Sequence, residues 1–515
     1  MTARASIAAV FLAVAAALTF AGCPRARQAG PESGDTLDGI RASGQLRWGC
    51  DVQGGAPYVY LDVEDLETYI GFEAELADAI GQQLGVQPER TQCQWDQLIP
   101  ALERGDMDVA MNGIEVTPER QAEVAFTRPY FVSTLMVSVR SGTAIPRSLV
   151  QLRGKRVGTL KASFAQRVLK LQGDIDVSGY DDDMAPYVDL VHGRIEAVVM
   201  DTPIAKYVGG LEGLVHSETD WGQALYAIAC RKGDDRLVAA LDDAIAKLAA
   251  SGKLREIYER YGLWNSATAE ALHDPGPART PPVMLDSYLR SLEPPTLGVK
   301  LLRYAKMLKP LGKAALMTLA LSIVGMAIAI ALGLILALLR IYGPWPARLL
   351  ATVYIEGIRG TPLLIQLYII FYALPDLGLN LPKFLAAVLG LGLNYAAYEA
   401  ENYRAGITSI ALGQTEAAHS LGLTHLQTLR FIIVPQALRI VIPPVTNDFI
   451  ALLKDSSIVS VISMVELTLK YNELASATGD RIGIGFLAGS LYFLLGWPFA
   501  KLAAKLEERA RKGRR

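Results

Sequence analysis

The stretch AALMTLALSIVGMAIAIALGLILALL, residues 314 to 339, has no charged side chain. As a helix rising about 1.5 Å per residue it would be roughly 39 Å long, which is enough to cross the hydrocarbon core of a bilayer. Further apolar stretches follow near residues 350–374, 383–403, 431–453 and 482–500. The carboxyl-terminal part of the chain is therefore predicted to be an all-α transmembrane domain of about five helices.

Composition separates this region from the residues before it. Charged residues make up 20% of the 515 residues. They are scattered throughout residues 36–270, whereas residues 314–339 have none. Soluble domains average about 25% charged residues. Fifty Lys and Arg against 52 Asp and Glu give a formal net charge of -2, which argues against a nucleic-acid-binding protein. The composition indicates a soluble part joined to a membrane part.

The first 23 residues, MTARASIAAVFLAVAAALTFAGC, have the layout of a secretory signal peptide. Their apolar core is too short for a comfortable membrane span. Ala21-Gly22-Cys23 resembles a bacterial lipoprotein box, in which Cys23 would be lipidated after cleavage. An uncleaved anchor, or a cut nearby that leaves Cys23 incidental, are the alternatives. Each places the following residues outside the cytoplasm, beginning with a linker over residues 24–43.

Three further cysteines, Cys50, Cys93 and Cys230, allow at most one disulfide among themselves. Cys50 and Cys93 end two predicted strands, so they either pair in an oxidising compartment or remain buried thiols. The chain has no CxxC pair, no His-Cys cluster and only five histidines. A structural zinc site is therefore not expected.

Residues 44–265 alternate strand-like runs with helical patterns. The strand-like runs are LRWGC, RTQCQW, VAMNG, TLMVSV, RVGTL, IEAVVM and YAIAC. Residues 72–84 carry apolar side chains at intervals of four, and residues 236–250 repeat this helical pattern. The alternation predicts an α/β fold with mainly parallel sheets. Ligands of such folds bind at the carboxyl ends of strands, near helix amino termini.

Six segments of this region occur in a diagnostic order. They are GQLRWGCDVQGGAPYVY, GFEAELADAIGQQLG, WDQLIPALERGDMDVAMNGIEVTPERQAEVAFTRPY, GKRVGTLKASFAQ, GRIEAVVMDTP and YAIACRKGDDRL. Together they resemble the polar amino-acid-binding proteins of ABC importers. The resemblance implies a type II periplasmic binding protein fold, in which two α/β lobes joined by a two-strand hinge close over one amino acid. Lobe one would comprise residues 44–137 and 233–265, and lobe two residues 138–232.

The resemblance also assigns a ligand site. A zwitterion removed from water needs a cation for its carboxylate, and an anion and carbonyl groups for its ammonium. Arg120 stands where the family places the carboxylate-binding arginine, and Asp201 where it places the ammonium-binding aspartate. The other residues that the family pattern assigns are Gly113 for its carbonyl, Ser163 for its hydroxyl and N–H, Trp95 for packing on the ligand, and Asp51 after the first strand.

Two positions depart from the family pattern and bear on specificity. Glu115 replaces a Ser or Thr, and Phe164 replaces a small residue. Glu115, Asp51 and Asp201 together would make the cleft acidic, which suggests a polar amino acid, including a cationic one, as the ligand. The alternative is that Glu115 pairs with Arg120. Each assignment also has a purely structural alternative: a surface charge for Arg120, a helix cap for Asp201, ordinary core for Trp95 and a turn for Asp51.

Residues 266–300 hold six prolines with little periodicity, as in a semi-rigid spacer, and mark the boundary before a membrane domain over 301–515. Five spans that start outside place the carboxyl terminus inside, and the basic tail after Ala500 fits the positive-inside rule. The basic residues between 300 and 313 would lie outside, against that rule. An extra or a missing span is therefore an alternative.

A second motif lies inside the membrane domain. Glu416-Ala417-Ala418, Gly422 and Pro435 keep the spacing of an EAA loop, with GIRGTPLLIQL, YEAENYRAGI and VPQALRIVIPPVTNDFIALLKDSS around it. These segments resemble the permeases of polar amino-acid ABC importers. The resemblance implies a cytoplasmic coupling helix gripped by a soluble ATPase, with Glu416 as an anchor and Gly422 at a sharp turn.

The chain has no GxxxxGK[ST] motif and so presents no P-loop to ATP, and GxSxG, HExxH and kinase motifs are also absent. We expect no enzymatic activity, no cofactor and no metal, with ATP used by a separate cytoplasmic ABC ATPase docked at residues 413–430. The sequence is interpreted as a substrate-binding domain fused to its permease in an ABC amino-acid importer. A homodimer in the bacterial inner membrane is expected, with the binding domain on the periplasmic or extracellular side. The alternative is a membrane-tethered amino-acid sensor or ligand-gated channel.

Overall fold

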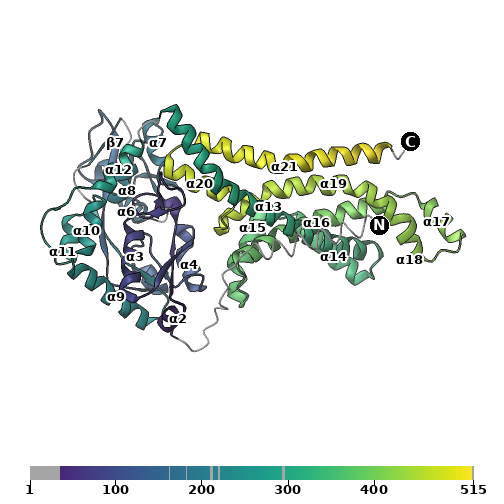
Figure 1. The fold of residues 1–515 in the computed structure, drawn as a ribbon, viewed down its shortest axis with the longest axis horizontal. Coiled ribbons are helices and arrows are strands. Elements are labelled where there is room, and N and C mark those ends of the chain that lie inside the picture. The colour runs from purple at the N-terminus through teal and green to yellow at the C-terminus, as the bar shows by residue number, and fades with distance from the viewer. Residues whose placement is uncertain are drawn as a thin grey trace. The chain divides into compact units, whose positions relative to one another are not determined.

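A computed structural model describes residues 35–161, 163–180, 182–208, 213–217, 221–292 and 296–512. The predicted signal peptide and Cys23 lie outside these residues. The chain divides into two compact units. We call residues 29–307 with 472–482 the α/β unit, and residues 308–471 with 483–515 the helical unit. Each is described by itself (Figure 1).

The first sheet of the α/β unit forms lobe one and has the strand order β4-β1-β5-β13-β6. β4 and β5 run parallel to β1, whereas β13 pairs antiparallel with β5 and β6. Apolar side chains of α3 and α9, the two helices predicted from periodicity, are buried in its core. The elements are β1 (Gln45–Cys50), α3 (Phe72–Leu84), β4 (Gln87–Gln92), α4 (Leu98–Glu103), β5 (Val109–Ala110), α5 (Pro118–Glu123), β6 (Ala125–Phe126), β13 (Ala229–Cys230), α9 (Asp235–Ala250) and α10 (Lys253–Arg260).

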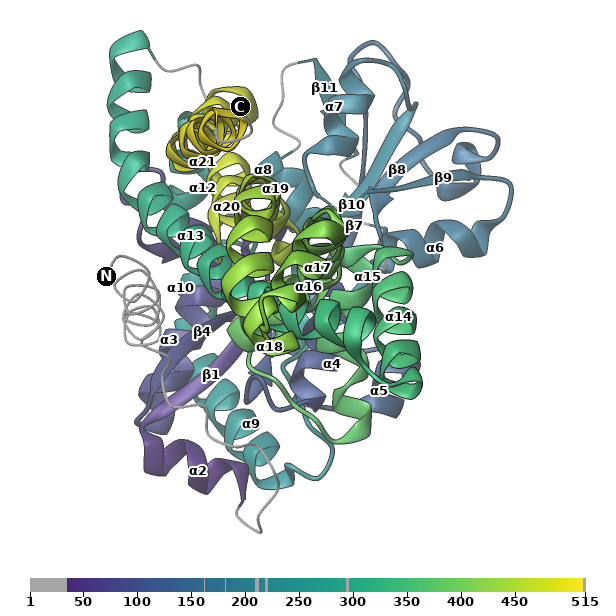
Figure 2. The same ribbon diagram turned by 90° about the vertical axis from the view of Figure 1, so that its right-hand side faces the viewer.

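The second sheet forms lobe two and has the order β11-β7-β10-β8-β9, with β12 also paired to β7. Figure 2 shows β8, β9 and β10 side by side, with α6 packed beside them. β8 runs parallel to β9 and β10, but β7 is antiparallel to all three of its partners, so the sheets are mixed rather than mainly parallel. The elements are β7 (Phe131–Arg140), β8 (Arg156–Leu160), α6 (Phe164–Gln172), β9 (Asp176–Tyr180), α7 (Ala185–Val191), β10 (Ala197–Asp201), α8 (Thr202–Val208), β11 (Leu214–His216) and β12 (Trp221–Tyr226).

Two neighbouring segments connect the lobes. The Tyr130 N–H donates to the Tyr226 carbonyl at 2.9 Å, and the Thr127 N–H donates to the Ile228 carbonyl at 3.0 Å. β7 belongs to the second sheet from Phe131 onward, and β13 already belongs to the first. The chain therefore crosses between the lobes earlier than the predicted boundaries after residues 137 and 232.

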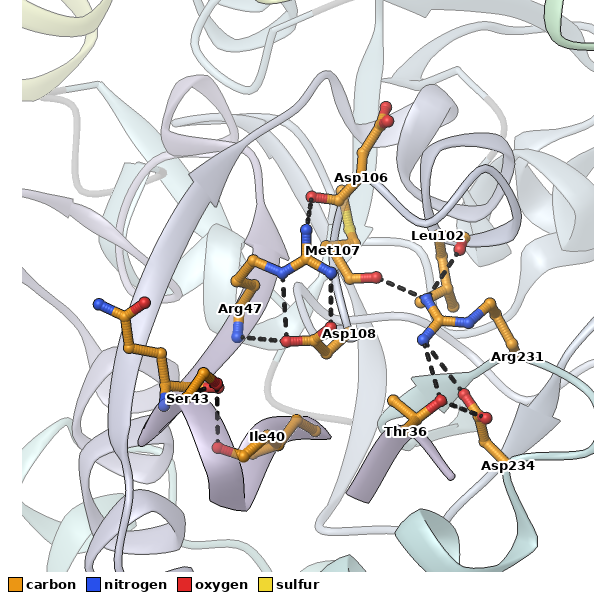
Figure 3. Close-up of polar contacts among 11 residues, drawn as sticks. Thr36, Ile40, Ser43, Arg47, Leu102, Asp106, Met107, Asp108, Arg231 and Asp234 are labelled. Carbon is orange, nitrogen blue, oxygen red and sulfur yellow. Dashed lines mark hydrogen bonds and ion pairs between the residues drawn. The ribbon is translucent and has the colours of Figure 1, made fainter. Parts of the chain in front are cut away.

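The predicted linker over residues 24–43 contains a folded helix, α2 (Thr36–Ser43), whose Leu37 and Ile40 are buried in the core. Figure 3 shows how the helix is held. Arg231 donates to the Met107 carbonyl at 2.6 Å and to the Thr36 hydroxyl at 3.4 Å. The α/β unit thus begins before residue 44.

The predicted spacer over residues 266–300 is also folded against the α/β unit for much of its length. It contains α11 (Ser266–Ala271) and α12 (Val283–Leu292). Tyr288 of α12 is buried, with its ring centre 5.6 Å from that of Tyr60 and 5.0 Å from that of Tyr207. These contacts extend the α/β unit beyond the predicted boundary at residue 265.

The three cysteines predicted either to form one disulfide or to remain thiols are buried thiols in the structure. Cys50 and Cys93 are adjacent through their backbones, since the Cys93 N–H donates to the Cys50 carbonyl at 3.0 Å.

The helical unit holds the apolar segments. α16 and α19 pack closely, and a Cβ added at Gly406 of α16 would lie 2.2 Å from a methyl group of Val441 of α19. Small residues permit this approach of two helices in a membrane. The elements are α13 (Leu297–Tyr342, which begins in the α/β unit), α14 (Trp345–Arg359), α15 (Leu363–Tyr368), α16 (Lys383–Thr408), α17 (Leu412–Ser420), α18 (His425–Thr428), α19 (Val434–Asp455), α20 (Leu467–Thr478, which ends in the α/β unit) and α21 (Arg481–Lys512, whose first two residues belong to the α/β unit).

Three helical segments of the described residues are long and apolar enough to cross a membrane: Leu297–Tyr342, His425–Ile462 and Arg481–Leu506. The stretch predicted as a span near 350–374 is divided, because α14 ends at Arg359 and α15 begins at Leu363. α16 has 26 residues, about 39 Å of helix, but carries buried polar residues such as Asn394. The helical unit thus contains several apolar helices, of which three satisfy both length and composition.

Candidate functional site

Arg120 is positioned by the start of a short helix. The Thr117 hydroxyl accepts a hydrogen bond from the Arg120 N–H at 3.3 Å, and Pro118 occupies the first turn of α5. Both residue types favour a helix start. The Arg120 guanidinium lies 4.9 Å from the centre of the Trp95 ring, and the Arg120 side chain is 16% exposed. It is a mostly buried cation on an aromatic face rather than a surface charge.

Glu115 is the immediate partner of Arg120. Arg120 Nη1 donates to the Glu115 carbonyl at 3.1 Å and forms an ion pair with Oε2 of the Glu115 carboxylate. Oε1 of the same carboxylate accepts a hydrogen bond from the Phe164 N–H at 2.9 Å. Glu115 comes from lobe one and Phe164 from lobe two, so this carboxylate connects the lobes. Of the two possibilities that the sequence left open, the structure contains the Glu115–Arg120 pair.

Ser163 and Phe164 form the start of α6. The Ser163 hydroxyl accepts from the Gln166 N–H at 3.2 Å and donates to the Leu160 carbonyl at 2.8 Å. This is the capping arrangement expected of a serine at a helix amino terminus. The Phe164 N–H lies in the first turn of α6, where an N–H has no intrahelical acceptor. It donates to Glu115.

Asp201 ends β10 and is 7% exposed. Its Oδ2 accepts a hydrogen bond from the Tyr226 hydroxyl, which lies 3.0 Å from the Tyr58 hydroxyl, while its Oδ1 has no hydrogen-bond partner among the described residues. Burial, and next the negative charge of Glu115, raise the pKa of Asp201 above its ordinary value. A backbone bridge joins Glu115 to Tyr226, whose hydroxyl donates to Asp201. The Glu115 and Asp201 carboxylates therefore lie in one neighbourhood.

Gly113 adopts a left-handed conformation, with φ +60°, against the ring of Tyr58. A Cβ at this position would lie 2.9 Å from Tyr58 Cε1, so only glycine fits without displacement. Its N–H donates at 2.7 Å to Glu73, which is fully buried and also accepts from the Tyr130 hydroxyl. Burial raises the pKa of Glu73 to about 7.

Asp51 lies behind Trp95. Asp51 Oδ2 accepts from the Trp95 N–H at 3.1 Å, and Oδ1 accepts from Gln53 and Gln92, each at 2.9 Å. The Trp95 indole N–H donates to the Asn112 carbonyl at 2.8 Å. These contacts join the Asp51 carboxylate to the backbone of Trp95 and to Gln53 and Gln92.

The structure thus brings together Arg120, Glu115, Trp95, Ser163 and Phe164, and places Asp201 within electrostatic range of Glu115 and Arg120. Sequence reasoning missed Tyr226 and Glu73. Glu73 is a charged residue of α3 at 0% exposure, next to the apolar stripe, and the fully buried Tyr226 is the last residue of β12. The described residues contain no group of His, Cys, Asp and Glu suited to hold a metal.

The EAA segment forms a helix-turn-helix in the helical unit. α17 ends just before Gly422, which has φ +79° and donates its N–H to the His419 carbonyl at 2.9 Å. Thr424 and Gln427 then form a reciprocal capping box at the start of α18. Glu416 and Ala417 are exposed, Ala418 is buried, and Pro435 opens α19. Three leucines of this segment are at least three-quarters exposed: Leu412 (80%), Leu421 (82%) and Leu426 (75%).

Both units match known protein families. Residues 46–263 match the bacterial extracellular solute-binding proteins, family 3, and residues 329–512 match the binding-protein-dependent transport system inner membrane component. The L-cystine transport system permease protein TcyB of Bacillus subtilis is 39% identical over 37% of this chain and 82% of that protein. The glutamine transport system permease protein GlnP of Escherichia coli K12 is 36% identical over 38% of this chain and 91% of that protein.

Solved structures also resemble the α/β unit. A mutant of ArgBP from T. maritima is 29% identical over 44% of this chain and 99% of that chain, with a TM-score of 0.41.

These matches define a transport component that carries its solute-binding domain and its membrane permease in one polypeptide. The chain belongs to the amino-acid ABC transporter permeases, with the type II solute-binding domain fused ahead of the permease domain. Both are transport families rather than enzyme families, and the sensor alternative is not favoured.

Proposed function

We propose that this chain captures a polar amino acid between the two lobes of its α/β unit and passes it through its helical unit. A separate cytoplasmic ATPase would drive the transfer. One observation carries the proposal: each lobe supplies one buried charge of opposite sign. Lobe one supplies the mostly buried cation of Arg120, and lobe two supplies the buried carboxylate of Asp201 at the end of a strand. An α-amino acid presents the complementary pair of charges.

The chemistry of each group supports its role. The Arg120 guanidinium can make parallel hydrogen bonds to a ligand carboxylate, and the Trp95 ring beneath it fixes its plane. Asp201 Oδ1 would accept from a ligand ammonium, which would compensate for the cost of burying that oxygen. Ser163, Gly113 and Phe164 would contribute hydrogen bonds or contacts around the two ends of the ligand, and Asp51 would act through Trp95.

The relatives support an amino acid as the ligand class. Their names specify transport of L-cystine, of glutamine and, for a 37% identical permease of Bacillus subtilis, of arginine. They differ in the side chain that is carried, so the proposal names the shared amino-acid backbone rather than one substrate.

The 413–430 segment supports the coupling role. Glu416, Ala417 and Gly422 are exposed on a short helix and its turn, and the exposed leucines beside them suit burial against another protein. We propose that the ATPase docks here from the cytoplasm, and that two chains pair so that two such segments engage two ATPase subunits. The binding domain would then lie on the periplasmic or extracellular side, anchored additionally if Cys23 is lipidated.

Reconstitution tests the proposal. The full chain and its co-purifying ATPase would be placed in vesicles that contain ATP, and uptake of each of the twenty radiolabelled amino acids would be measured. We expect ATP-dependent accumulation of at least one polar amino acid, and its loss in Asp201→Asn. Vesicles that accumulate none of the twenty would refute the proposal.

A further inference from the structure

Glu115 makes the contacts that a bound carboxylate would make. One of its carboxylate oxygens pairs with the Arg120 guanidinium, and the other accepts from the first N–H of α6, at Phe164, at 2.9 Å. The Glu115 side chain is only 3% exposed. A helix amino terminus and a guanidinium are the two donors most suited to an anion, and here one side chain uses both.

The remaining groups favour positive charge. Asp201 is 7% exposed, and its Oδ1 is a buried acceptor without a partner among the described residues. The charges of Glu115 and Arg120 cancel, so an ionised Asp201 leaves the neighbourhood with one net negative charge. A ligand cation would neutralise that charge, whereas a zwitterion would bring a second carboxylate that competes with Glu115 for Arg120 Nη1 and the Phe164 N–H.

We propose that Glu115 is a specificity-determining residue that acts as a built-in carboxylate. The site then binds an organic amine or guanidine that lacks a carboxylate with Glu115 in place. It binds an amino acid only when Glu115 leaves Arg120 and Phe164. This inference rests on the proposed function, in which Arg120 and Asp201 line the ligand site.

Two consequences separate this role from that of an ordinary acidic lining residue. An acidic lining residue attracts every cationic ligand, so its removal weakens the binding of an amino acid and of the corresponding amine alike. A built-in carboxylate competes only with ligands that carry their own. Its removal therefore strengthens the binding of the amino acid and weakens that of the amine.

Arginine and agmatine, its decarboxylated counterpart, form a matched pair of probes. Calorimetry on the full chain in detergent would compare both ligands in the wild type and in Glu115→Gln, which keeps the side-chain size and removes the charge. We expect wild type to favour agmatine, and Glu115→Gln to bind arginine about tenfold more tightly and agmatine about tenfold more weakly. Lysine and cadaverine provide a second pair of the same design.

Glu119→Gln is the control. Glu119 also lies on lobe one and faces Arg167 of lobe two at 3.6 Å, but its side chain is 74% exposed. Exposed ion pairs contribute little, so we expect this variant to bind all four probes like the wild type.

Amide hydrogen exchange gives a readout that needs no ligand. Glu115 accepts from the Phe164 N–H, so Glu115→Ala, which removes this acceptor, should exchange the amide about tenfold faster than the wild type or Glu119→Gln. Unchanged exchange, or equal weakening of arginine and agmatine in Glu115→Gln, would overturn the inference.

The outcomes also separate the inference from the proposed function. Amino acids that bind and are transported equally well by wild type and Glu115→Gln would leave the proposed function intact and refute the role of Glu115. Binding of agmatine or cadaverine by the wild type, with arginine or lysine bound only by Glu115→Gln and no amino acid transported by either form, would refute the proposed function and support the inference.

Discussion

Arg120 is held by three groups at once: the Glu115 carboxylate, the Glu115 carbonyl and the face of Trp95. Replacing it by alanine leaves the Glu115 carboxylate buried without its cation, which costs about 3–5 kcal/mol for a buried pair. We expect Arg120→Ala to abolish amino-acid binding while the chain stays folded.

Calorimetry and circular dichroism on the full chain would check both parts. Arg120→Lys is the matched variant, because it keeps the charge but loses the planar fork, and it should bind at an intermediate level. Wild-type affinity in Arg120→Ala would contradict the assignment of the site.

Glu73 makes the stability of the α/β unit dependent on pH. Its folded pKa of about 7 lies above the ordinary value of 4.5, so the folded chain holds this proton over a pH range in which the unfolded chain has released it. The contribution of Glu73 to the free energy of unfolding is therefore complete below about pH 4.5 and is lost as the pH rises through about 7.

Chemical denaturation of the full chain at pH 5 and pH 8 would measure this effect, with Glu73→Gln as the isosteric reference. We expect the wild type to lose more stability than Glu73→Gln between the two pH values. Equal losses in the two proteins would show that Glu73 does not titrate in this range.

At the residue scale, the sequence assigned Arg120, Trp95 and Ser163 to one candidate site. It left open whether Glu115 pairs with Arg120, and the structure contains that pair. Arg120, Trp95 and Ser163 could be located because each follows a recognisable strand or helix signal. Tyr226 could not, because its contact with Asp201 joins positions 25 residues apart through the fold. Asp51 was predicted as a ligand residue, and the sequence did not predict that its carboxylate accepts hydrogen bonds from Trp95, Gln53 and Gln92.

At the scale of elements, the turn between α17 and α18 depends on one backbone conformation. Nothing lies within 4 Å of a Cβ added at Gly422, so a side chain would not clash there, but φ +79° is unfavourable for any residue with a Cβ and most of all for a branched one. Gly422→Val should cost about 1–2 kcal/mol locally and reduce ATPase docking.

Co-purification of the ATPase with the full chain would measure docking, and amino-acid binding should stay unchanged. Gly413→Val is the control, because Gly413 lies within α17, is exposed and has no atom within 4 Å of its added Cβ. Equal ATPase recovery with Gly422→Val and Gly413→Val would remove the role of the turn.

Most strands and the long helices of the α/β unit could be predicted from periodicity, because burial on one face leaves a repeating pattern. The 266–300 region could not. Its Pro281-Pro282 pair suggested a spacer, yet these residues directly precede α12, and proline favours the start of a helix as well as its absence. Tyr288 of α12 packs against Tyr60 and Tyr207, and these contacts favour a folded helix over a spacer. Both partners lie far from Tyr288 in the sequence, so the local pattern does not reveal them.

At the scale of the whole molecule, the proposed function requires the 413–430 segment to face the cytoplasm. Leu421 is 82% exposed, so Leu421→Cys should react with a membrane-impermeant maleimide. The reaction should occur only when the reagent is on the cytoplasmic side. Cys50, Cys93 and Cys230 are buried, so they provide a low background once Cys23 is replaced by serine.

The comparison would use intact cells and inverted membrane vesicles. We expect labelling of Leu421→Cys in inverted vesicles and protection in intact cells. Val150→Cys, at an exposed position of lobe two (53% exposed), should show the opposite pattern. Labelling of Leu421→Cys from outside would contradict the proposed orientation.

The division into a soluble and a membrane part was predicted correctly from charge and hydropathy, because the two solvents select different compositions. The number of spans was less certain from sequence. Polar side chains such as Asn394 lie inside the protein, so hydropathy alone does not identify α16 as a membrane helix.

Because both units belong to one polypeptide, a cell makes receptor and permease in a fixed one-to-one ratio. Transport capacity can then be adjusted only by the number of complete molecules, not by secreting surplus receptor. A receptor blocked by a tight, non-transported ligand also cannot be exchanged for a fresh one, so such a compound would silence each molecule that it occupies until it dissociates.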